Sequence, residues 1–367
     1  MKRKYKVWLT VSKSAVRKNI STIRGLLDKK TKLYAVVKSN AYGHGLMQFT
    51  AIADKARIDG FCVDSVVEGV KLRAHGIAKP ILVLGYSLPV LYTTAAQHDI
   101  TVTISNKEAF IAWSKAKIKP QFHLKIDTGM HRQGFSLNDF EKLIKRFKIQ
   151  DSRFKNFLTG IYTHFAMAKN CNDKAFTQKQ SAAFQKGCGI AEEAGFKGFV
   201  RHASATGGTL LGKEFHFDLV RVGIGLYGIW PSEELENQLG KKIILASALI
   251  LCSIVSEIKT VKKGEGIGYD LTERVTRDTT IAVIPLGYWH GIPRAASSVG
   301  WVLVGTSKAR IIGRVSMDMI TIDVTGILCT VGTEVRIASL LLARSMDASP
   351  YEVITRINPL IHKEITR

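Results

Sequence analysis

Residues 12–38 read SKSAVRKNISTIRGLLDKKTKLYAVVK, a stretch that contains one helix pattern followed by one strand pattern. The spacing of one helical face is kept by the apolar residues Val16, Ile20, Ile23 and Leu27. The run at 33–37 is short, apolar and rich in β-branched residues, which is typical of a buried strand. Because the same alternation continues to about residue 228, this stretch predicts the architecture of the first part of the chain.

Seven further strand patterns follow the first one. They lie at residues 60–66, 81–86, 101–105, 122–127, 157–165, 199–204 and 218–226. Candidate helices separate several of them, as at residues 106–117, 137–148 and 173–195. Repeated strand–helix units imply parallel strands, and eight units in about 215 residues match the size of a (β/α)8 barrel. We therefore expect an α/β fold in which residues 1–235 form this barrel.

The pattern changes after residue 231. Strand patterns with glycine-containing turns then lie at residues 245–262, 279–285, 301–304, 308–312, 319–324 and 334–337. No long helix pattern separates them, and only residues 351–361 regain a helical period. We expect residues 236–367 to form a mostly-β C-terminal domain, and the first ~10 residues are a candidate strand of that domain.

The composition is that of a folded globular protein, because 46% of the residues are hydrophobic and 23% are charged. The five cysteines are scattered without a C-x-x-C pair, so we expect neither a disulfide framework nor a metal site. The apolar run at 7–11 is too short for a signal peptide, and no run is long enough to span a membrane. We expect a cytoplasmic protein with no membrane partner.

The net charge of +23 raises one alternative, a non-enzymatic protein that binds nucleic acid or an anionic surface. The lysines are dispersed over the whole chain, and no nucleic-acid-binding motif is present. We therefore expect no nucleic-acid partner, and a salt-sensitive affinity would be the test of this alternative.

Polar side chains fall at or near the ends of the strand patterns, where the loops of a barrel build its active site. They are Lys38, Asp127, Arg132, His164, Ser204 and Arg221. Each one alone has an ordinary interpretation, such as a solvated loop lysine or a core histidine, but the set is harder to explain that way. A lysine that loses hydration is suited to Schiff-base chemistry. Ser204–Ala205 and Gly223–Ile224 fall where barrels bind phosphate. Together these features suggest pyridoxal 5′-phosphate (PLP).

Several longer motifs make the interpretation specific. They are residues 35–45 (AVVKSNAYGHG), 125–132 (KIDTGMHR), 162–165 (YTHF), 221–224 (RVGI), 268–269 and 287–288 (both GY), 316–318 (SMD) and 351–353 (YEV). In this order they resemble the motifs of the alanine racemases, PLP enzymes built from a barrel and a β domain. The resemblance covers essentially the whole chain, and it implies the same fold, cofactor and reaction.

The resemblance also implies roles for the cofactor residues. Lys38 would hold PLP as a Schiff base, and Arg221 would face the pyridine nitrogen while Arg132 faces the phenolic oxygen. The remaining cofactor-binding residues would be Tyr42, Ser204, Gly223 and Ile224 at the phosphate, with His164 and Tyr351 elsewhere in the site. A guanidinium does not give up its proton, so Arg221 would not protonate the pyridine nitrogen. The unprotonated ring would then be a weak electron sink.

For catalysis, the resemblance implies acid/base groups on two faces of the substrate, Lys38 on one and Tyr269 on the other. Tyr269 would act in the site of the partner subunit of a homodimer. Tyrosine is ordinarily a poor base at neutral pH, so His164 and Arg221 would supply positive charge.

The substrate would be bound by Arg132 and by the backbone of Met317, at an entrance narrowed by Tyr288 and Tyr351. A narrow entrance favours alanine. Lys125 matches a lysine that is carbamylated in many members of the family. The expected role is the supply of D-alanine for peptidoglycan.

Some alternatives stay open within the same fold. A serine racemase or a racemase of broader specificity is one, because a small pocket rejects an added hydroxyl only weakly. A decarboxylase is disfavoured, since such enzymes pair the pyridine nitrogen with a carboxylate whereas this chain has Arg221. Three positions depart from the family pattern: Ala203 replaces an asparagine, Asp270 a glycine and His290 an aspartate.

Overall fold

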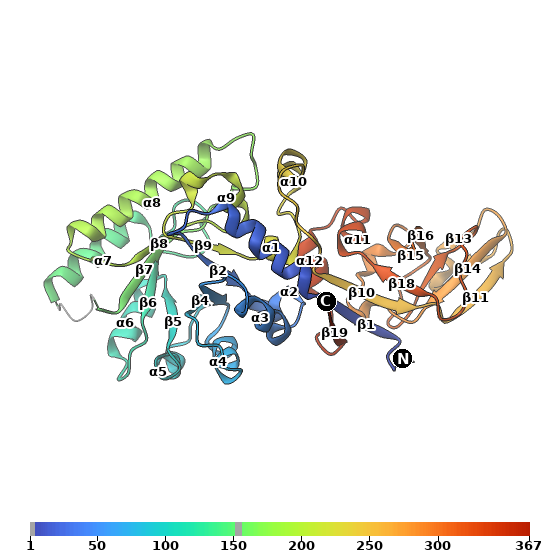
Figure 1. The fold of residues 1–367 in the computed structure, drawn as a ribbon, viewed down its shortest axis with the longest axis horizontal. Helices are drawn as coiled ribbons and strands as arrows, with labels where there is room; N and C mark the ends of the chain where they lie inside the picture. Colours follow the sequence, from blue (N-terminus) through green and yellow to red (C-terminus); the bar gives the residue numbers. More distant parts are fainter. Residues whose placement is uncertain (1–3, 151–155) are drawn as a thin grey trace. The chain divides into compact units, whose positions relative to one another are not determined.

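The computed structural model describes residues 4–150 and 156–367 (Figure 1). Its chain divides into two compact units. The first, called here the barrel unit, comprises Ala15–Ser39 and Phe49–Ala246. The second, called here the β unit, comprises Met1–Ser14, Asn40–Gln48 and Ser247–Arg367. The chain therefore leaves the barrel unit directly after Lys38 and Ser39 and returns to it a few residues later.

The barrel unit is built on an eight-stranded sheet in which all neighbouring strands are parallel. Its order is β8-β7-β6-β5-β4-β3-β2-β9. The strands are β2 (Lys32–Val36), β3 (Gly60–Val63), β4 (Ile81–Tyr86), β5 (Ile100–Ile104), β6 (Phe122–Lys125), β7 (Leu158–Tyr162), β8 (Val200–His202) and β9 (Leu219–Val222). Backbone bonds from Asp218 N to Arg201 O (3.0 Å) and from Arg221 N to Ser204 O (2.9 Å) bridge the two end strands. The sheet is thus a nearly closed barrel, which confirms the expected (β/α)8 fold.

Helices surround the strands, as the repeated strand–helix pattern predicts (Figure 1). They are α1 (Lys13–Leu26), α3 (Leu46–Asp54), α4 (Val66–Ala74), α5 (Tyr92–Gln97), α6 (Lys107–Lys115), α7 (Leu137–Gln150), α8 (Ala175–Glu193), α9 (Thr206–Leu211) and α10 (Glu233–Leu239). On α1 the side chains of Val16, Ile20 and Ile23 are fully buried, which confirms the helical face read from the sequence. Side-chain caps start some helices: Asn106 accepts a bond from Ala109 N at the start of α6.

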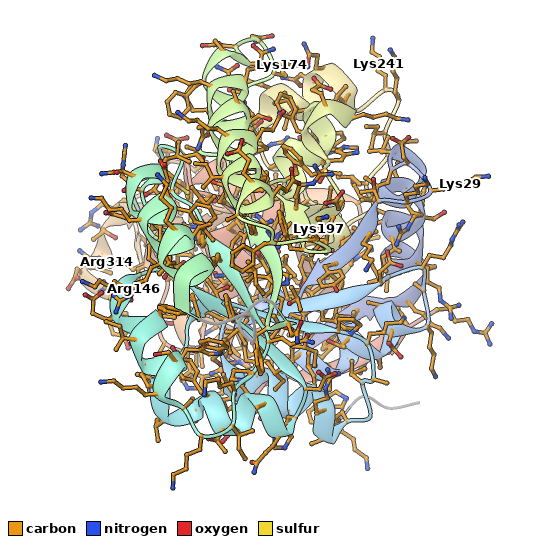
Figure 2. All side chains as sticks on the ribbon, turned by 90° about the vertical axis from the view of Figure 1, so that its left-hand side faces the viewer. Lys29, Arg146, Lys174, Lys197, Lys241 and Arg314 are labelled. Carbon is orange, nitrogen blue, oxygen red and sulfur yellow. The ribbon has the colours of Figure 1, made fainter. Side chains whose placement is uncertain are left out.

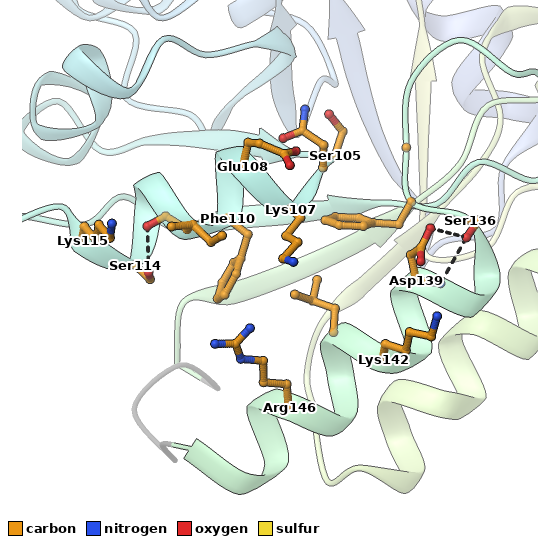
Figure 3. A pocket seen from close by; sticks show the side chains of 15 residues that line it. Ser105, Lys107, Glu108, Phe110, Ser114, Lys115, Ser136, Asp139, Lys142 and Arg146 are labelled. Carbon is orange, nitrogen blue, oxygen red and sulfur yellow. Dashed lines mark hydrogen bonds between the residues drawn. The ribbon is translucent and has the colours of Figure 1, made fainter.

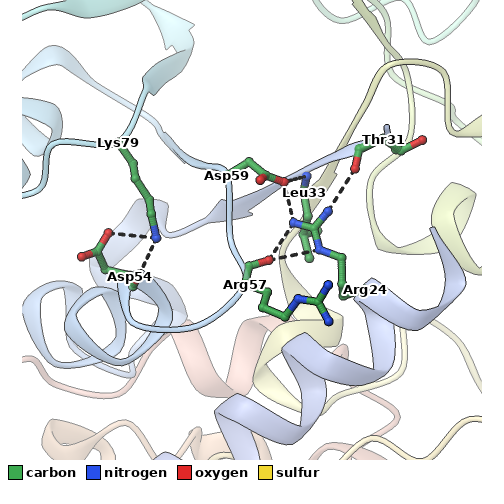
Figure 4. Close-up of polar contacts among 7 residues, drawn as sticks. All are labelled: Arg24, Thr31, Leu33, Asp54, Arg57, Asp59 and Lys79. Carbon is green, nitrogen blue, oxygen red and sulfur yellow. Dashed lines mark hydrogen bonds and ion pairs between the residues drawn. The ribbon is translucent and has the colours of Figure 1, made fainter. Parts of the chain in front are cut away.

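A polar network ties α1 to the start of the first barrel strand (Figure 4). The Arg24 guanidinium pairs with Asp59 (2.5 Å) and donates to the carbonyls of Arg57 (2.6 and 3.1 Å) and Thr31 (3.0 Å). Asp59 in turn accepts a bond from Leu33 N (2.7 Å). Because these contacts fix the N-terminal end of β2, they also fix where its other end places Lys38.

The β unit contains a nine-stranded sheet with the order β11-β14-β17-β16-β15-β18-β10-β1-β19. The strands are β1 (Val7–Ser12), β10 (Leu249–Ile254), β11 (Glu257–Val261), β14 (Thr279–Ile284), β15 (Trp301–Val304), β16 (Ser307–Ile312), β17 (Ile320–Asp323), β18 (Glu334–Ile337) and β19 (His362–Thr366). A two-stranded sheet of β12 (Gly266–Ile267) and β13 (Glu273–Arg274) carries a short turn. This unit confirms the expectation of a mostly-β fold after the barrel.

The last part of the chain differs from its predicted form. The helical period at 351–361 yields only α12 (Pro350–Thr355), and a further helix, α11 (Ser339–Ser345), was not predicted. Residue 358 precedes Pro359 and is therefore biased away from helical angles, so the helix ends before it. The chain then forms β19, which pairs in parallel with β1. Within residues 4–150 and 156–367, no helix is both long enough and apolar enough to cross a membrane.

Candidate functional site

Lys38 lies directly after β2, at the carboxyl end of the barrel strands. Its Nζ is 3.1 Å from the Oδ1 of Asp64, which follows the neighbouring strand β3. Glu68 accepts bonds from the backbone N–H of Ser39 and of Asp64, both at 2.8 Å, and so holds the two loops together. About a third of the Lys38 side chain (37%) remains exposed, so the amine is accessible at the mouth of the barrel.

The residues after Lys38 form a left-handed turn. Ser39, Asn40, Ala41 and Tyr42 have φ angles of 54°, 56°, 50° and 52° within the short helix α2 (Lys38–Tyr42). Left-handed angles cost L-residues about 1–2 kcal/mol each, and Asn tolerates them best. Bonds from Gly43 N to Asn40 O (3.1 Å) and from Leu46 N to Asn40 Oδ1 (2.9 Å) hold the turn. Strain of this kind gathers at functional sites, which supports a special role for this segment.

Gly43 and Tyr42 sit against the α12 region within the β unit. A Cβ on Gly43, which has φ +85°, would lie 2.1 Å from the carbonyl oxygen of Ile354, so only glycine fits there. The Tyr42 and Tyr351 rings pack with centroids 6.0 Å apart. Burial, followed by the nearby Tyr42, raises the pKa of Tyr351 above its usual range. The structure thus brings together two of the tyrosines that the sequence assigned to the site.

Arg221 is a fully buried cation at the centre of the barrel unit, with only 2% of its surface exposed. One Nη atom donates to the Nδ1 of His202, and the other donates to the carbonyls of Thr163 and Ala203, both at 2.9 Å. Its guanidinium also lies over the ring of Tyr162, 5.0 Å from the centroid. No carboxylate in the described part of the chain pairs with Arg221, so its charge is uncompensated by the protein.

The histidines around Arg221 are neutral at pH 7. Burial, and then the charge of Arg221, lowers the pKa of His123 and of His164 to about 3 and that of His202 well below its usual value. Because a guanidinium only donates, His202 accepts at Nδ1, and its Nε2 therefore donates to the Nδ1 of His123 (2.8 Å). His164 lies 3.5 Å from an Arg221 nitrogen. The expectation that His164 supplies positive charge is therefore wrong, since burial beside a cation keeps it uncharged.

Lys125 is a second buried cation, at the end of β6. Its Nζ donates to the Oε1 of Gln133 (2.9 Å), whose Nε2 donates to the hydroxyl of Ser105 (3.3 Å). Burial, followed by the charges of Arg221 and Arg132, lowers the pKa of Lys125 to about 8. Gln133 was not among the predicted site residues, although it directly follows Arg132 at the end of the 125–132 motif.

The ends of β8 and β9 meet where a phosphate site was expected. Helix α9 begins at Thr206, and a 3₁₀ turn, η4 (Ile224–Tyr227), begins after Gly223. Gly225 N donates to the Thr206 hydroxyl (3.3 Å), which joins the two segments. The Ser204 hydroxyl is buried and donates to the carbonyl of Phe215 (2.6 Å). It would have to rotate to donate to a phosphate, so main-chain N–H groups are the readier donors here.

Tyr269 lies in the turn between β12 and β13 of the β unit and is 70% exposed. Its neighbour Asp270, at φ 58°, pairs with Arg314 (3.3 Å). Tyr288 N donates to Ser316 O (3.0 Å), which places Tyr288 beside the segment that carries Met317. The large exposed apolar side chains of these segments are Tyr269, Leu271, Tyr288, Trp289, Met317 and Met319. Such a group of exposed apolar residues is typical of an interaction surface.

The three departures from the family pattern each have a structural setting. His290 is buried, and its Nδ1 accepts a bond from Gly287 N (3.1 Å), which holds the turn that contains Tyr288. Asp270 forms the ion pair with Arg314. Ala203 is fully buried and offers its carbonyl to Arg221.

The residues at the carboxyl ends of the barrel strands fit PLP. Lys38 offers an accessible amine for a Schiff base, and Arg221, Lys125 and Arg132 give this end of the barrel an excess of positive charge. A phosphate-bearing aromatic ring complements that charge. Among the described residues, no group of three or more His, Cys, Asp or Glu side chains is arranged to hold a metal.

The remaining positive charge is spread over the surface. Figure 2 shows Lys29, Lys174, Lys197 and Lys241 on separate segments of the barrel unit. A dispersed charge is typical of a solvated surface and gives no single track for a nucleic-acid backbone.

Comparison with known proteins gives a consistent result over the whole chain. The family model described as alanine racemase, N-terminal domain, matches residues 11–231, and the model for the alanine racemase C-terminal domain matches residues 248–365. An alanine racemase of Leptospira interrogans is 33% identical over 380 aligned residues, covering 98% of this chain and 96% of the relative. An alanine racemase of Desulforamulus reducens is 36% identical, with 87% and 85% covered.

Solved structures agree with these matches. The alanine racemase of the D-cycloserine producer Streptomyces lavendulae superposes with a TM-score of 0.91 at 31% identity, covering 100% of this chain and 98% of that one. The alanine racemase of Bacillus anthracis with bound L-Ala-P gives a TM-score of 0.90 at 30% identity, with 100% and 96% covered.

Proposed function

Because this chain belongs to the alanine racemase family, we propose that Lys38 and Tyr269 are the two acid/base groups with which it interconverts L- and D-alanine. Racemisation of alanine is the reaction of the family and of this chain. The assignment of the individual residues is our proposal. The observation that carries it is the accessible Lys38 amine at the same end of the barrel as a buried Arg221 that has no carboxylate partner among the described residues.

PLP is the cofactor of the family, and when bound it supplies an electron-withdrawing ring that makes the Cα proton of an amino acid acidic. Lys38 is the residue that would hold it and would then move a proton at Cα on its own face of the substrate. Arg221 would offer the pyridine nitrogen a hydrogen bond without a proton, since a guanidinium stays protonated. Negative charge at Cα is then poorly stabilised and short-lived, which favours its return to alanine over transamination or decarboxylation.

Tyr269 would move the proton on the opposite face. Its side chain is 70% exposed on the β unit, beside the exposed Leu271, so a second subunit can cover this surface and receive the hydroxyl. Arg221 is the source of positive charge that would help this hydroxyl act as a base, because His164 is neutral. We therefore propose a homodimer in which each site combines Lys38 of one subunit with Tyr269 of the other.

Subunit exchange tests this arrangement. Lys38→Ala and Tyr269→Phe should each be inactive, and a mixture of the two that has exchanged subunits should regain activity. One site of each mixed dimer then holds both an intact Lys38 and an intact Tyr269. A mixture that stays inactive after demonstrated exchange would place both groups in a single chain.

Other residues would bind the cofactor and the substrate. Tyr42, Ser204 and the backbone of Gly223 and Ile224 would hold the phosphate, with His164 and Tyr351 also near the cofactor. The substrate carboxylate would be bound by Arg132 and by the backbone of Met317, while Tyr288 and Tyr351 narrow the entrance. These roles rest on the matching motifs and on the packing of Tyr42 against Tyr351.

Lys125 would carry a carbamate. Because its pKa is lowered to about 8, a substantial fraction of the amine is neutral near pH 8 and can attack carbon dioxide. The nitrogen forms a bond to carbon and releases one proton to solvent, and the product is an anion beside Arg132 and Arg221. Gln133 would hold the amine in place through the bond to its Oε1.

The proposed role in the cell is to supply D-alanine for peptidoglycan in the cytoplasm. The test of the substrate is to incubate the purified protein with PLP and either L-alanine or L-serine and to follow formation of the D-enantiomer. Alanine should be the better substrate. Turnover of serine or of longer amino acids at an equal kcat/KM would favour a racemase of broader specificity.

A further inference from the structure

A concave surface of the barrel unit lies between α6 and α7 (Figure 3), and none of the residues assigned above to the cofactor or the substrate lines it. This groove, called here the α6–α7 groove, has a volume of about 860 Å³, which is within the usual size range of small-molecule sites. Its apolar lining comes from Phe110, Ile111, Phe135 and Leu143. Phe135 and Leu143 are buried, whereas Ile111 is 37% exposed, so the groove offers an apolar floor to solvent.

The charges around this floor are unequal. The cations that line the groove are Lys107, Lys115, Lys142 and Arg146, against two carboxylates, Glu108 and Asp139. Asp139 is engaged locally, because it accepts a bond from the Ser136 hydroxyl (2.7 Å). Lys107, Lys115 and Lys142 form no ion pair with any described residue. In Figure 3 the Lys107 side chain extends from α6 and the Arg146 side chain extends from α7 toward the space between the two helices, and both charged ends lie near the Phe110 ring.

The inner wall of the groove is fixed before any ligand arrives. Phe135 N donates to Lys125 O (2.9 Å) and Phe135 O accepts from Asp127 N (2.8 Å), so this residue is pinned to the end of β6. Ser105 is held by the bond from Gln133. A preformed wall lowers the entropy lost when a ligand binds. The groove therefore has three features of a small-molecule site: an apolar floor, convergent charges and a rigid back.

We propose that the α6–α7 groove is a second binding site, separate from the racemase site, that takes a small amphiphilic anion. The expected ligand has a flat aromatic or branched apolar body and one carboxylate, sulfonate or phosphate group. The apolar body packs on Phe110, Ile111 and Leu143, while the anionic group lies between Lys107 and Arg146. The occupant is a free solute rather than a membrane or a nucleic acid, because the charges converge inside a concave space that a bilayer surface or a duplex does not enter.

The test uses the PLP-loaded enzyme with saturating alanine, so that the racemase site is occupied, and follows the fluorescence of anilinonaphthalene sulfonate. The groove variant is the double substitution Lys107→Glu with Lys142→Glu. The matched control is Lys29→Glu with Lys197→Glu, which changes the net charge equally at exposed positions elsewhere. Reversal of two exposed charges should weaken binding of the probe about tenfold, and the control should change it by less than about twofold. Both variants should keep wild-type racemase activity.

Two further measurements complete the test. Phenylnaphthylamine, which has the same aromatic body without the sulfonate, should bind more weakly than the anion. Ile111→Asp should abolish binding of both probes, and it provides an independent variant if the double substitution does not fold. Equal losses in the groove and control variants would overturn the proposal, because the probe would then be sensing net charge. It would also be overturned if the groove variant lost attachment only to phosphatidylglycerol vesicles, which would mark a membrane surface.

Discussion

The left-handed turn after Lys38 predicts an unusual response to glycine. Ala41 is fully buried and has a φ of 50°, so replacing it with glycine removes a buried methyl group but also relieves backbone strain. The methyl group contributes about 0.8 kcal/mol, and the added freedom of the unfolded chain costs about 0.5–1 kcal/mol. Relief of the left-handed conformation returns about 1–2 kcal/mol. The free energy of unfolding of Ala41→Gly should therefore stay within about 1 kcal/mol of wild type.

Ala343 provides the matched control for this prediction. It is also fully buried and belongs to the same β unit, but it lies inside the right-handed helix α11. Ala343→Gly loses a similar methyl group and about 1 kcal/mol of helix propensity, so it should destabilise by about 2 kcal/mol. Denaturant unfolding of the two variants should show a gap of about 1–2 kcal/mol. Equal destabilisation by both substitutions would refute the argument that the turn after Lys38 is strained.

Three other predictions concern the packing at Gly43, the titration of Lys125 and the Arg24 network at the start of β2. Gly43→Ala should destabilise the protein by several kcal/mol more than Gly76→Ala. Both glycines have a positive φ, but of the two only the added Cβ at Gly43 would meet a backbone oxygen. Denaturant midpoints of the two variants will show whether this difference exists. In buffer free of carbon dioxide, where Lys125 carries no carbamate, the lowered pKa of its amine means that the folded state binds fewer protons than the unfolded state between about pH 8 and the usual pKa of lysine, so stability should rise with pH in that window. Lys125→Gln should flatten that rise, and a rise that persists in the variant would assign it to another group. Arg24→Ala should lower the free energy of unfolding by about 2 kcal/mol, because it removes the network at the start of β2. The control Lys29→Ala should change the free energy of unfolding by less than about 0.5 kcal/mol. Equal effects of the two substitutions would show that the network contributes nothing.

Much of the fold could be predicted from the sequence because most barrel strands, such as β2, β3 and β9, are apolar runs that are largely buried. The runs at 33–37 and 81–86 lie over β2 and β4, and the face of α1 lies where its period places it. The same regularity located Lys38 and Arg221, because polar residues at the ends of buried strands stand out from their surroundings.

The parts that could not be predicted depend on tertiary contacts. Nothing in residues 39–42 except Asn40 favours left-handed angles, since the turn is held by bonds to Gly43 and Leu46. The helix α11 is a short apolar run that resembles a strand in sequence. The final helix α12 ends at Thr355, because the residue before Pro359 is biased away from helical angles and so prevents the helix from continuing.

The charges in the site were the least predictable feature. The titration of His164 depends on burial beside Arg221, and no sequence spacing shows that burial. Gln133 is polar in a loop, and its contact with Lys125 arises only because the loop folds back beside the end of β6. Residue types and positions were therefore predictable, whereas their protonation required the packed structure.

Deuterium exchange by Tyr269→Phe tests the two-base proposal most directly. The variant should keep the visible absorption of the bound cofactor, and its racemisation should fall about a hundredfold to ten-thousandfold in both directions. In heavy water, Lys38 should still exchange the Cα proton on its own face. Slow deuterium incorporation should therefore survive for one enantiomer of alanine and vanish for the other. Equal residual exchange into both enantiomers would contradict the assignment of Lys38 and Tyr269 to opposite faces.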